Sequence, residues 1–161
     1  MVKRISLIFL FLWLAGNCLT RPSVAEATTD SLAFDFNLTD LDNNRVSLSD
    51  FRGSPTVLFF WTTWCHFCVK ELRLLNNSYA QLTEDGFELL AINIGEPAYR
   101  VNDFIKNYHL TSRVLLDEDE TVAMAYGLIG VPTYVIVDRE GYIRFKGNAF
   151  PRNEYQALIS E

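Results

Sequence analysis

The chain has 161 residues, of which 49% are hydrophobic and 14% aromatic, and its formal net charge is −6. This length fits one domain plus a targeting segment, and the apolar content is sufficient for a packed core, which excludes a disordered chain. The acidic balance also argues against nucleic-acid binding, which requires a basic surface.

The N-terminus has the pattern of an export signal. Lys3 and Arg4 precede an apolar stretch at residues 5–14, and small and polar residues follow it. We expect residues 1–27 to be a signal peptide or a membrane or lipid anchor. Residues 28–161 then form a single domain that lies outside the cytoplasm.

Three fates of the N-terminal segment stay open. Small residues two positions apart favour cleavage after Ala25 or Ala27, and this is the first alternative. Lipidation at Cys18 is the second, and an uncleaved anchor is the third. The apolar stretch is shorter than the roughly 20 residues that a membrane-spanning helix needs.

Hydrophobic patterning beyond a polar linker at residues 20–31 predicts strands that alternate with helices. Alternating apolar residues around an Asp/Asn-rich turn at 40–44 predict a β-hairpin, and one helical turn is expected at 49–53. Further strands are expected at 56–61, 87–94, 114–116, 133–137 and 142–146, and helices at 66–83, 98–108, 117–126 and 154–160. This order implies an α/β fold with a mixed sheet and helices on both faces.

The most informative motif is Cys-His-Phe-Cys at residues 65–68, directly after the apolar strand at 56–61. Two cysteines at this spacing can form a disulfide and reopen it. A helix start offers unpaired N–H groups and the positive end of the helix dipole, which stabilise the thiolate that attacks in disulfide exchange. With Cys18 removed, no other cysteine remains, so the pair indicates redox chemistry rather than a structural disulfide framework.

A lone Cys-x-x-Cys pair also occurs in zinc sites. Zinc needs four ligands, but a second cysteine pair is missing and His66 and His109 are the only histidines. We therefore expect no metal site and no cofactor other than the redox-active disulfide. The acidic run at 117–120 is interpreted as a helix cap rather than as metal ligands.

Three features accompany the cysteine motif: a hairpin before it, a strand–helix piece at 92–108, and Val-Pro-Thr at 131–133 before a strand. Together they resemble the TlpA/ResA-like group of exported thiol-disulfide oxidoreductases over residues 34–159. The resemblance implies a thioredoxin-like fold, with a central mixed β-sheet flanked by helices. It also implies an N-terminal β-hairpin and an inserted strand–helix piece.

The resemblance implies roles for four residues, the two cysteines of the motif and two residues of the Val-Pro-Thr segment. Cys65 would be the attacking thiol and Cys68 the thiol that resolves the mixed disulfide. Pro132 would follow a cis peptide bond and face the disulfide. The backbone of Val131 would pair with an extended substrate. Separately from the resemblance, the position of Trp64 beside Cys65 predicts that it lines the site as apolar wall and helps to dock the substrate.

Cys68 is expected to lie on the buried face of its helix, where a thiol is a poor nucleophile and needs a base. Thioredoxins use an aspartate six residues before the first cysteine, but this chain has Phe59 at that position. Glu71 is the candidate replacement, because it lies three residues after Cys68 on the same helix and the resembling group has a functional glutamate there. A solvated helix glutamate is the alternative.

His66 and Phe67 are expected to tune the site. They replace the Glu-Pro or Gly-Pro pair that is usual between such cysteines, and without the proline the turn is less rigid. A protonated His66 would stabilise the thiolate and make the protein more oxidising, whereas an exposed ring of little influence is the alternative. The direction of electron flow therefore stays open.

We expect an exported oxidoreductase that exchanges its disulfide with a protein substrate, with reduction favoured. By resemblance, the substrates include apocytochrome c, in cytochrome c maturation, and a membrane thiol donor supplies the electrons. A peroxiredoxin-type peroxidase is one alternative, although Leu58 stands where that motif has proline. A copper carrier is the other, although such carriers typically space their cysteines more widely.

Overall fold

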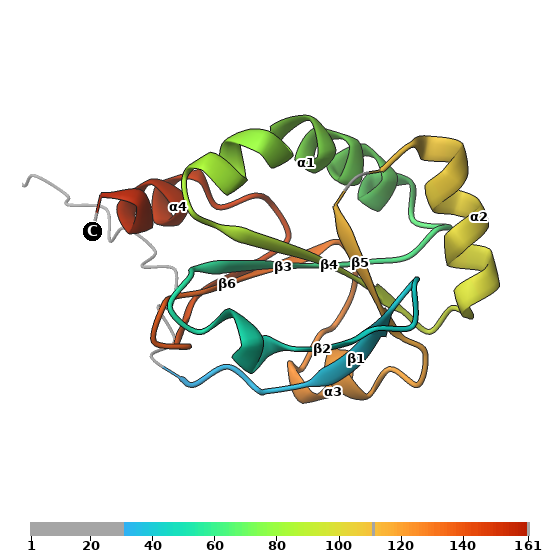
Figure 1. Ribbon diagram of the computed structural model, residues 1–161, viewed down its shortest axis with the longest axis horizontal. Coiled ribbons are helices and arrows are strands. Elements are labelled where there is room, and N and C mark those ends of the chain that lie inside the picture. The colour runs from blue at the N-terminus through green and yellow to red at the C-terminus, as the bar shows by residue number, and fades with distance from the viewer. Residues whose placement is uncertain (1–30, 111, 161) are drawn as a thin grey trace, which may run out of the picture.

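Two apolar runs form the centre of the molecule. The computed structural model, which describes residues 31–110 and 112–160, contains one seven-stranded sheet in the order β2-β1-β5-β4-β3-β6-β7 (Figure 1). The two central strands are β3 (Thr56–Trp61) and β4 (Glu88–Ile94), which pair in parallel. Every residue of β3 is buried, as the continuous apolar run predicts for a strand covered on both faces.

The remaining strands extend the sheet on both sides of this centre. They are β1 (Asn37–Asp40), β2 (Arg45–Ser47), β5 (Arg113–Asp117), β6 (Thr133–Val137) and β7 (Ile143–Gly147). β5 is parallel to β4, whereas β1, β6 and β7 each pair antiparallel with a neighbouring strand. The sheet is therefore mixed, as predicted.

Helices cover both faces of the sheet (Figure 1). They are η1 (Leu48–Phe51), α1 (His66–Glu84), α2 (Ala98–Tyr108), α3 (Thr121–Ala125) and α4 (Arg152–Ile159). Apolar residues of α1, α2 and α4 pack on one face of the sheet, and those of η1 and α3 pack on the other. The predicted order of strands and helices is confirmed along the described chain.

Alternation along β3 supplies both halves of the core. Phe59 and Trp61 face the α1 side, while Leu58 and Phe60 face the α3 side. Burying one such side chain stabilises the fold by roughly 1.5–3 kcal/mol. β3 is consequently a rigid base for the residues that follow Trp61, where the cysteine motif begins.

The predicted hairpin and its Asp/Asn turn are confirmed. β1 and β2 pair antiparallel, with Leu38 opposite Val46. The Asp40 carboxylate accepts backbone N–H groups of Asp42 and Asn44 at 2.9 and 2.8 Å, which closes the turn. β1 also pairs with β5, so the hairpin is an extension of the main sheet.

The helix predicted at 117–126 is wrong at its first residues. Asp117 ends strand β5, and α3 begins only at Thr121. The buried Asp117 carboxylate accepts the backbone N–H groups of Val122 and Ala123 at 3.1 and 2.8 Å. The capping function of the acidic run is thus confirmed, but its first carboxylate reaches the helix from the end of the strand.

The predicted signal or anchor segment at 1–27 lies outside the described residues. Cleavage after Ala25 or Ala27, lipidation at Cys18 and an uncleaved anchor therefore stay predictions. Within residues 31–110 and 112–160, no helix is both long and apolar enough to cross a membrane.

Candidate active site at the start of helix α1

Cys65 and Cys68 form a disulfide at the N-terminus of α1, with their Cα atoms 5.2 Å apart. Cys65 is the N-cap residue, and its Sγ atom accepts the backbone N–H of Cys68 at 3.1 Å. Cys65 is 8% exposed and Cys68 is fully buried. The thiol at the helix start is therefore the more accessible one, and an N–H group already points at its sulfur, where it would stabilise a thiolate.

A buried glutamate holds the turn that leads from β3 to Cys65. Glu96 is 3% exposed, and its carboxylate accepts both the backbone N–H and the hydroxyl of Thr63 at 2.6 Å. The Asn93 amide also donates to Glu96 at 2.9 Å, and the Arg100 guanidinium lies 3.8 Å away. Because Thr63 stands two residues before Cys65, the inserted strand–helix piece directly positions the cysteine turn.

The sequence reasoning did not single out Glu96. The signal in the sequence was an acidic residue between Gly95 and Pro97, two residues after the end of the buried strand β4. A charged residue at the end of a parallel strand often lies in a site at the edge of the sheet. That Thr63 is its partner, however, follows only from the strand register. Asn93 is paired with Trp61 in the β3–β4 ladder, and this pairing brings the residues after both strands together.

The loop before β6 lies against the disulfide. The Val131–Pro132 peptide bond is cis, as predicted, and the Val131 carbonyl oxygen is 3.8 Å from the Cys65 Sγ atom. Asn148 donates to the Pro132 carbonyl at 2.8 Å, and the Thr133 hydroxyl donates to that of Gly130 at 2.7 Å. The loop and the cysteine pair thus form one site, in which substrate pairing by Val131 stays a prediction.

Large apolar side chains near the disulfide are exposed. Trp64 and Phe67 are each 72% exposed, and Ile129, two residues before Val131, is fully exposed. The His66 ring is also exposed and lies edge-on to Phe67, with ring centroids 6.1 Å apart. Exposed apolar groups around a reactive centre favour contact with another protein, while the tuning roles of His66 and Phe67 stay predictions.

Glu71 is hydrogen-bonded to a buried tyrosine. The Tyr134 hydroxyl donates to the Glu71 Oε2 atom at 2.8 Å, and Tyr134 lies opposite Phe59 in the β3–β6 ladder. Burial, with the hydrogen bond to Glu71 and its charge added, raises the pKa of Tyr134 far above its ordinary value. The hydroxyl consequently stays protonated and acts as a donor. The sequence reasoning named Glu71 but did not identify Tyr134.

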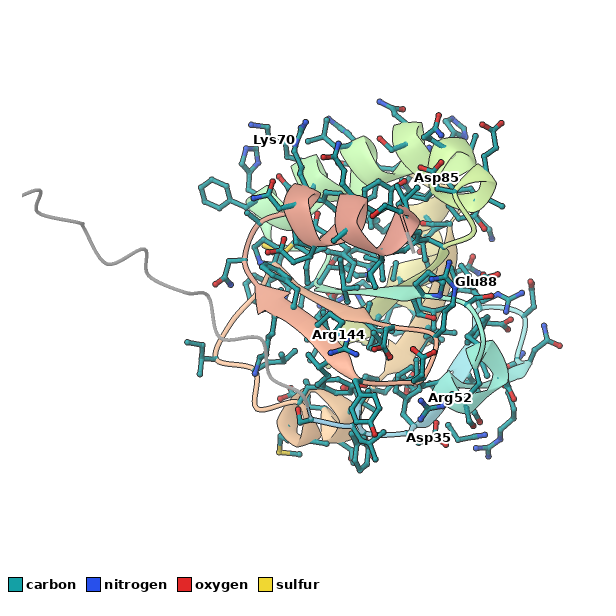
Figure 2. All side chains as sticks on the ribbon, turned by 90° about the vertical axis from the view of Figure 1, so that its left-hand side faces the viewer. Asp35, Arg52, Lys70, Asp85, Glu88 and Arg144 are labelled. Carbon is teal, nitrogen blue, oxygen red and sulfur yellow. A yellow bond between two sulfur atoms is a disulfide. The ribbon has the colours of Figure 1, made fainter. Side chains whose placement is uncertain are left out.

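A groove of about 520 Å³ runs between α1 and α4, and Glu71 and Tyr134 are among its lining residues. Figure 2 looks onto the face where α4 lies beside α1, with the disulfide as a yellow bond near the start of α1. Leu75, Phe150 and Tyr155 supply apolar lining. Within the described residues, no group of three or more His, Cys, Asp or Glu side chains could hold a metal ion.

Sequence comparison gives a family match and close relatives. Residues 29–146 match the model of the AhpC/TSA family. The thiol-disulfide oxidoreductase ResA of Geobacillus thermodenitrificans (strain NG80-2) is 37% identical over 114 residues, which are 71% of this chain and 66% of that protein. The similarity therefore spans slightly less than two thirds of the relative's length.

Solved structures have the same fold. The thioredoxin domain of a thiol-disulfide oxidoreductase from Bacteroides vulgatus aligns with a TM-score of 0.72 and 26% identity, over 83% of this chain and 97% of that one. StoA from Bacillus subtilis aligns with a TM-score of 0.67 and 25% identity, over 81% and 98%. The predicted thioredoxin-like fold and the resemblance to ResA-like proteins are confirmed, and the chain belongs to the AhpC/TSA family.

Proposed function

We propose that the chain is an extracytoplasmic thiol-disulfide oxidoreductase that exchanges the Cys65–Cys68 disulfide with protein substrates and acts as a reductant. The observation that carries the proposal is the placement of Cys65. Its sulfur accepts a backbone N–H at a helix start and lies 3.8 Å from the Val131 carbonyl oxygen. The names of the similar proteins, which are thiol-disulfide oxidoreductases, support the same chemistry.

The reaction begins with the reduced protein. The Cys65 thiolate attacks one sulfur of the substrate disulfide, that S–S bond breaks, and the other substrate sulfur leaves as a thiolate. Cys68 then gives its proton to Glu71 and attacks the Cys65 sulfur. The second substrate thiolate leaves, the Cys65–Cys68 disulfide closes, and two electrons have passed to the substrate.

A protein substrate is favoured by the surface around the disulfide. Trp64, Phe67 and Ile129 present apolar area that a small disulfide would leave uncovered. Apocytochrome c as the substrate and a membrane thiol as the electron donor are predictions that rest on the family resemblance. The extracytoplasmic location rests on that resemblance and on the pattern of residues 1–27.

Replacing Glu71 by glutamine is expected to slow resolution of the mixed disulfide by about tenfold or more, because a general base is lost from beside Cys68. The fold should be kept, since Glu71 lies at the edge of a groove and glutamine has nearly the same shape. Rapid-mixing kinetics of the reduced chain with an aryl disulfide measure this step separately from the attack by Cys65. An unchanged resolution rate would return Glu71 to the role of a solvated helix residue.

Two alternative functions are tested with the same protein. A peroxiredoxin-type peroxidase would consume hydrogen peroxide in its reduced form without a disulfide substrate, whereas we expect negligible consumption. Leu58, where that motif has proline, is buried inside strand β3. A copper carrier would bind copper(I) tightly and lose it in Cys65→Ser, and such binding would replace the oxidoreductase proposal.

A further inference from the structure

We propose that Tyr134 is a positioning residue whose hydroxyl holds Glu71 beside Cys68 and so sets the rate at which Cys68 resolves the mixed disulfide. The inference rests on the proposed function, because it assigns a partner to the proposed base. Its starting point is Phe59, the residue that stands where thioredoxins have a buried aspartate. With that position apolar and fully buried, any acid must come from elsewhere.

The core of the sheet fixes Tyr134. The side chain is fully buried, and its ring packs against Phe59 at 4.7 Å between centroids and edge-on against Phe150 at 5.7 Å. The hydroxyl at the tip of this clamped ring donates to Glu71 at 2.8 Å. The position of the Glu71 carboxylate is therefore set by strand β6, on which Tyr134 follows Pro132 by two residues.

The hydrogen bond gives the two carboxylate oxygens of Glu71 different roles. Tyr134 occupies Oε2, which leaves Oε1 to accept the proton of Cys68 one helical turn away. Arg152 lines the same groove from α4, but among the described residues no cation lies within ion-pairing distance of Glu71. Among the described residues, Tyr134 is the side-chain hydrogen-bond partner that can hold the orientation of Glu71.

The same groove supplies a matched control. Tyr155 of α4 donates its hydroxyl to Asp85, the residue that caps the C-terminus of α1. Its ring also packs against neighbouring aromatic residues, Phe87 at 4.6 Å and Phe150 at 5.5 Å. Tyr155→Phe thus removes a comparable hydroxyl–carboxylate bond at the opposite end of α1 from the cysteines. An effect that both tyrosine-to-phenylalanine substitutions produce would be structural. An effect that only Tyr134→Phe produces would indicate positioning of Glu71.

The test follows the reduced chain with one equivalent of dithiobis(nitrobenzoate), which releases a coloured thiolate at each step. Every variant carries Cys18→Ser, so that Cys65 and Cys68 are the only thiols that can react. The first phase reports attack by Cys65 and the second reports resolution by Cys68. We expect Tyr134→Phe to slow the second phase by about fivefold or more and to leave the first phase unchanged. Tyr155→Phe should leave both phases unchanged.

A double-mutant cycle separates positioning from a general structural effect. In a Glu71→Gln background, Tyr134→Phe should cause no further slowing, because the residue through which it acts is already disabled. The inference is overturned if Tyr134→Phe alone leaves the second phase unchanged while Glu71→Gln slows it, or if the two effects multiply. If Glu71→Gln itself has no effect, the proposed base fails and Tyr134 loses its role with it.

Discussion

Replacing Cys65 by serine is expected to abolish disulfide exchange, with a loss of about a thousandfold or more. Serine cannot form a mixed disulfide, and Cys68 is fully buried and cannot replace Cys65 as the attacking thiol. The assay is reduction of a protein disulfide by the chain, with dithiothreitol as the electron source. If Cys65→Ser still catalysed disulfide exchange, a residue other than Cys65 would be the attacking group.

Cys68→Ser is the matched control for this prediction. It keeps the attacking thiol and its helix N-terminus but removes the resolving thiol, so a mixed disulfide with the substrate should accumulate and be visible as a thiol-sensitive adduct. Net turnover should be lost in both variants, whereas only Cys68→Ser should form the adduct. If only Cys65→Ser formed the adduct, Cys68 would be the attacking thiol and Cys65 the resolving one.

Replacing Glu96 by alanine is expected to lower the free energy of unfolding by about 3 kcal/mol, because three donors lose their acceptor. The Thr63 N–H and hydroxyl and the Asn93 amide all point at this carboxylate. Each unsatisfied buried group costs roughly 1–3 kcal/mol, and Thr63 is only partly buried, so the lower part of the summed range applies. Urea unfolding followed by circular dichroism gives the value.

Arg100→Ala provides the comparison for Glu96→Ala. Arg100 lies 3.8 Å from Glu96, and its side chain is 55% exposed, so its removal should cost less than about 1 kcal/mol. The rate of attack by Cys65 should fall in Glu96→Ala but not in Arg100→Ala, since only Glu96 bonds the turn before the cysteine. Equal stabilities for Glu96→Ala and the unmodified chain would mean that other contacts hold this turn.

The sequence predicted best the strands and helices whose apolar residues follow a clear hydrophobic pattern. The six-residue apolar run of β3 has the length and the apolar continuity that favour a strand buried on both faces, and its bounds agree with the prediction. In α1, apolar residues at helical spacing, among them Leu72, Leu75 and Leu82, became the buried face. The helix at 117–126 was misjudged because acidic residues suit both a strand end and a helix start, and Asp117 serves both.

The reactive atoms of the site were predictable because they lie in short motifs, Cys-x-x-Cys and Val-Pro-Thr. The residues that support them were not, since Glu96 reaches Thr63 over 33 positions and Tyr134 reaches Glu71 over 63. Such contacts depend on which strands are neighbours and on their register, and one sequence carries too little information to fix either. Phe59 gave a partial signal, because it indicated that the usual acid is missing.

The midpoint potential of the Cys65–Cys68 couple is the most direct test of the proposed reductant. The chain would be equilibrated in graded thiol/disulfide buffers at neutral pH, and the fraction of closed disulfide would be read by alkylation. A reductant should give about −230 mV or lower, toward the value of thioredoxin. A value near −120 mV, as in strongly oxidising periplasmic enzymes, would contradict the proposal, identify the chain as a disulfide donor and give His66 a role in stabilising the thiolate.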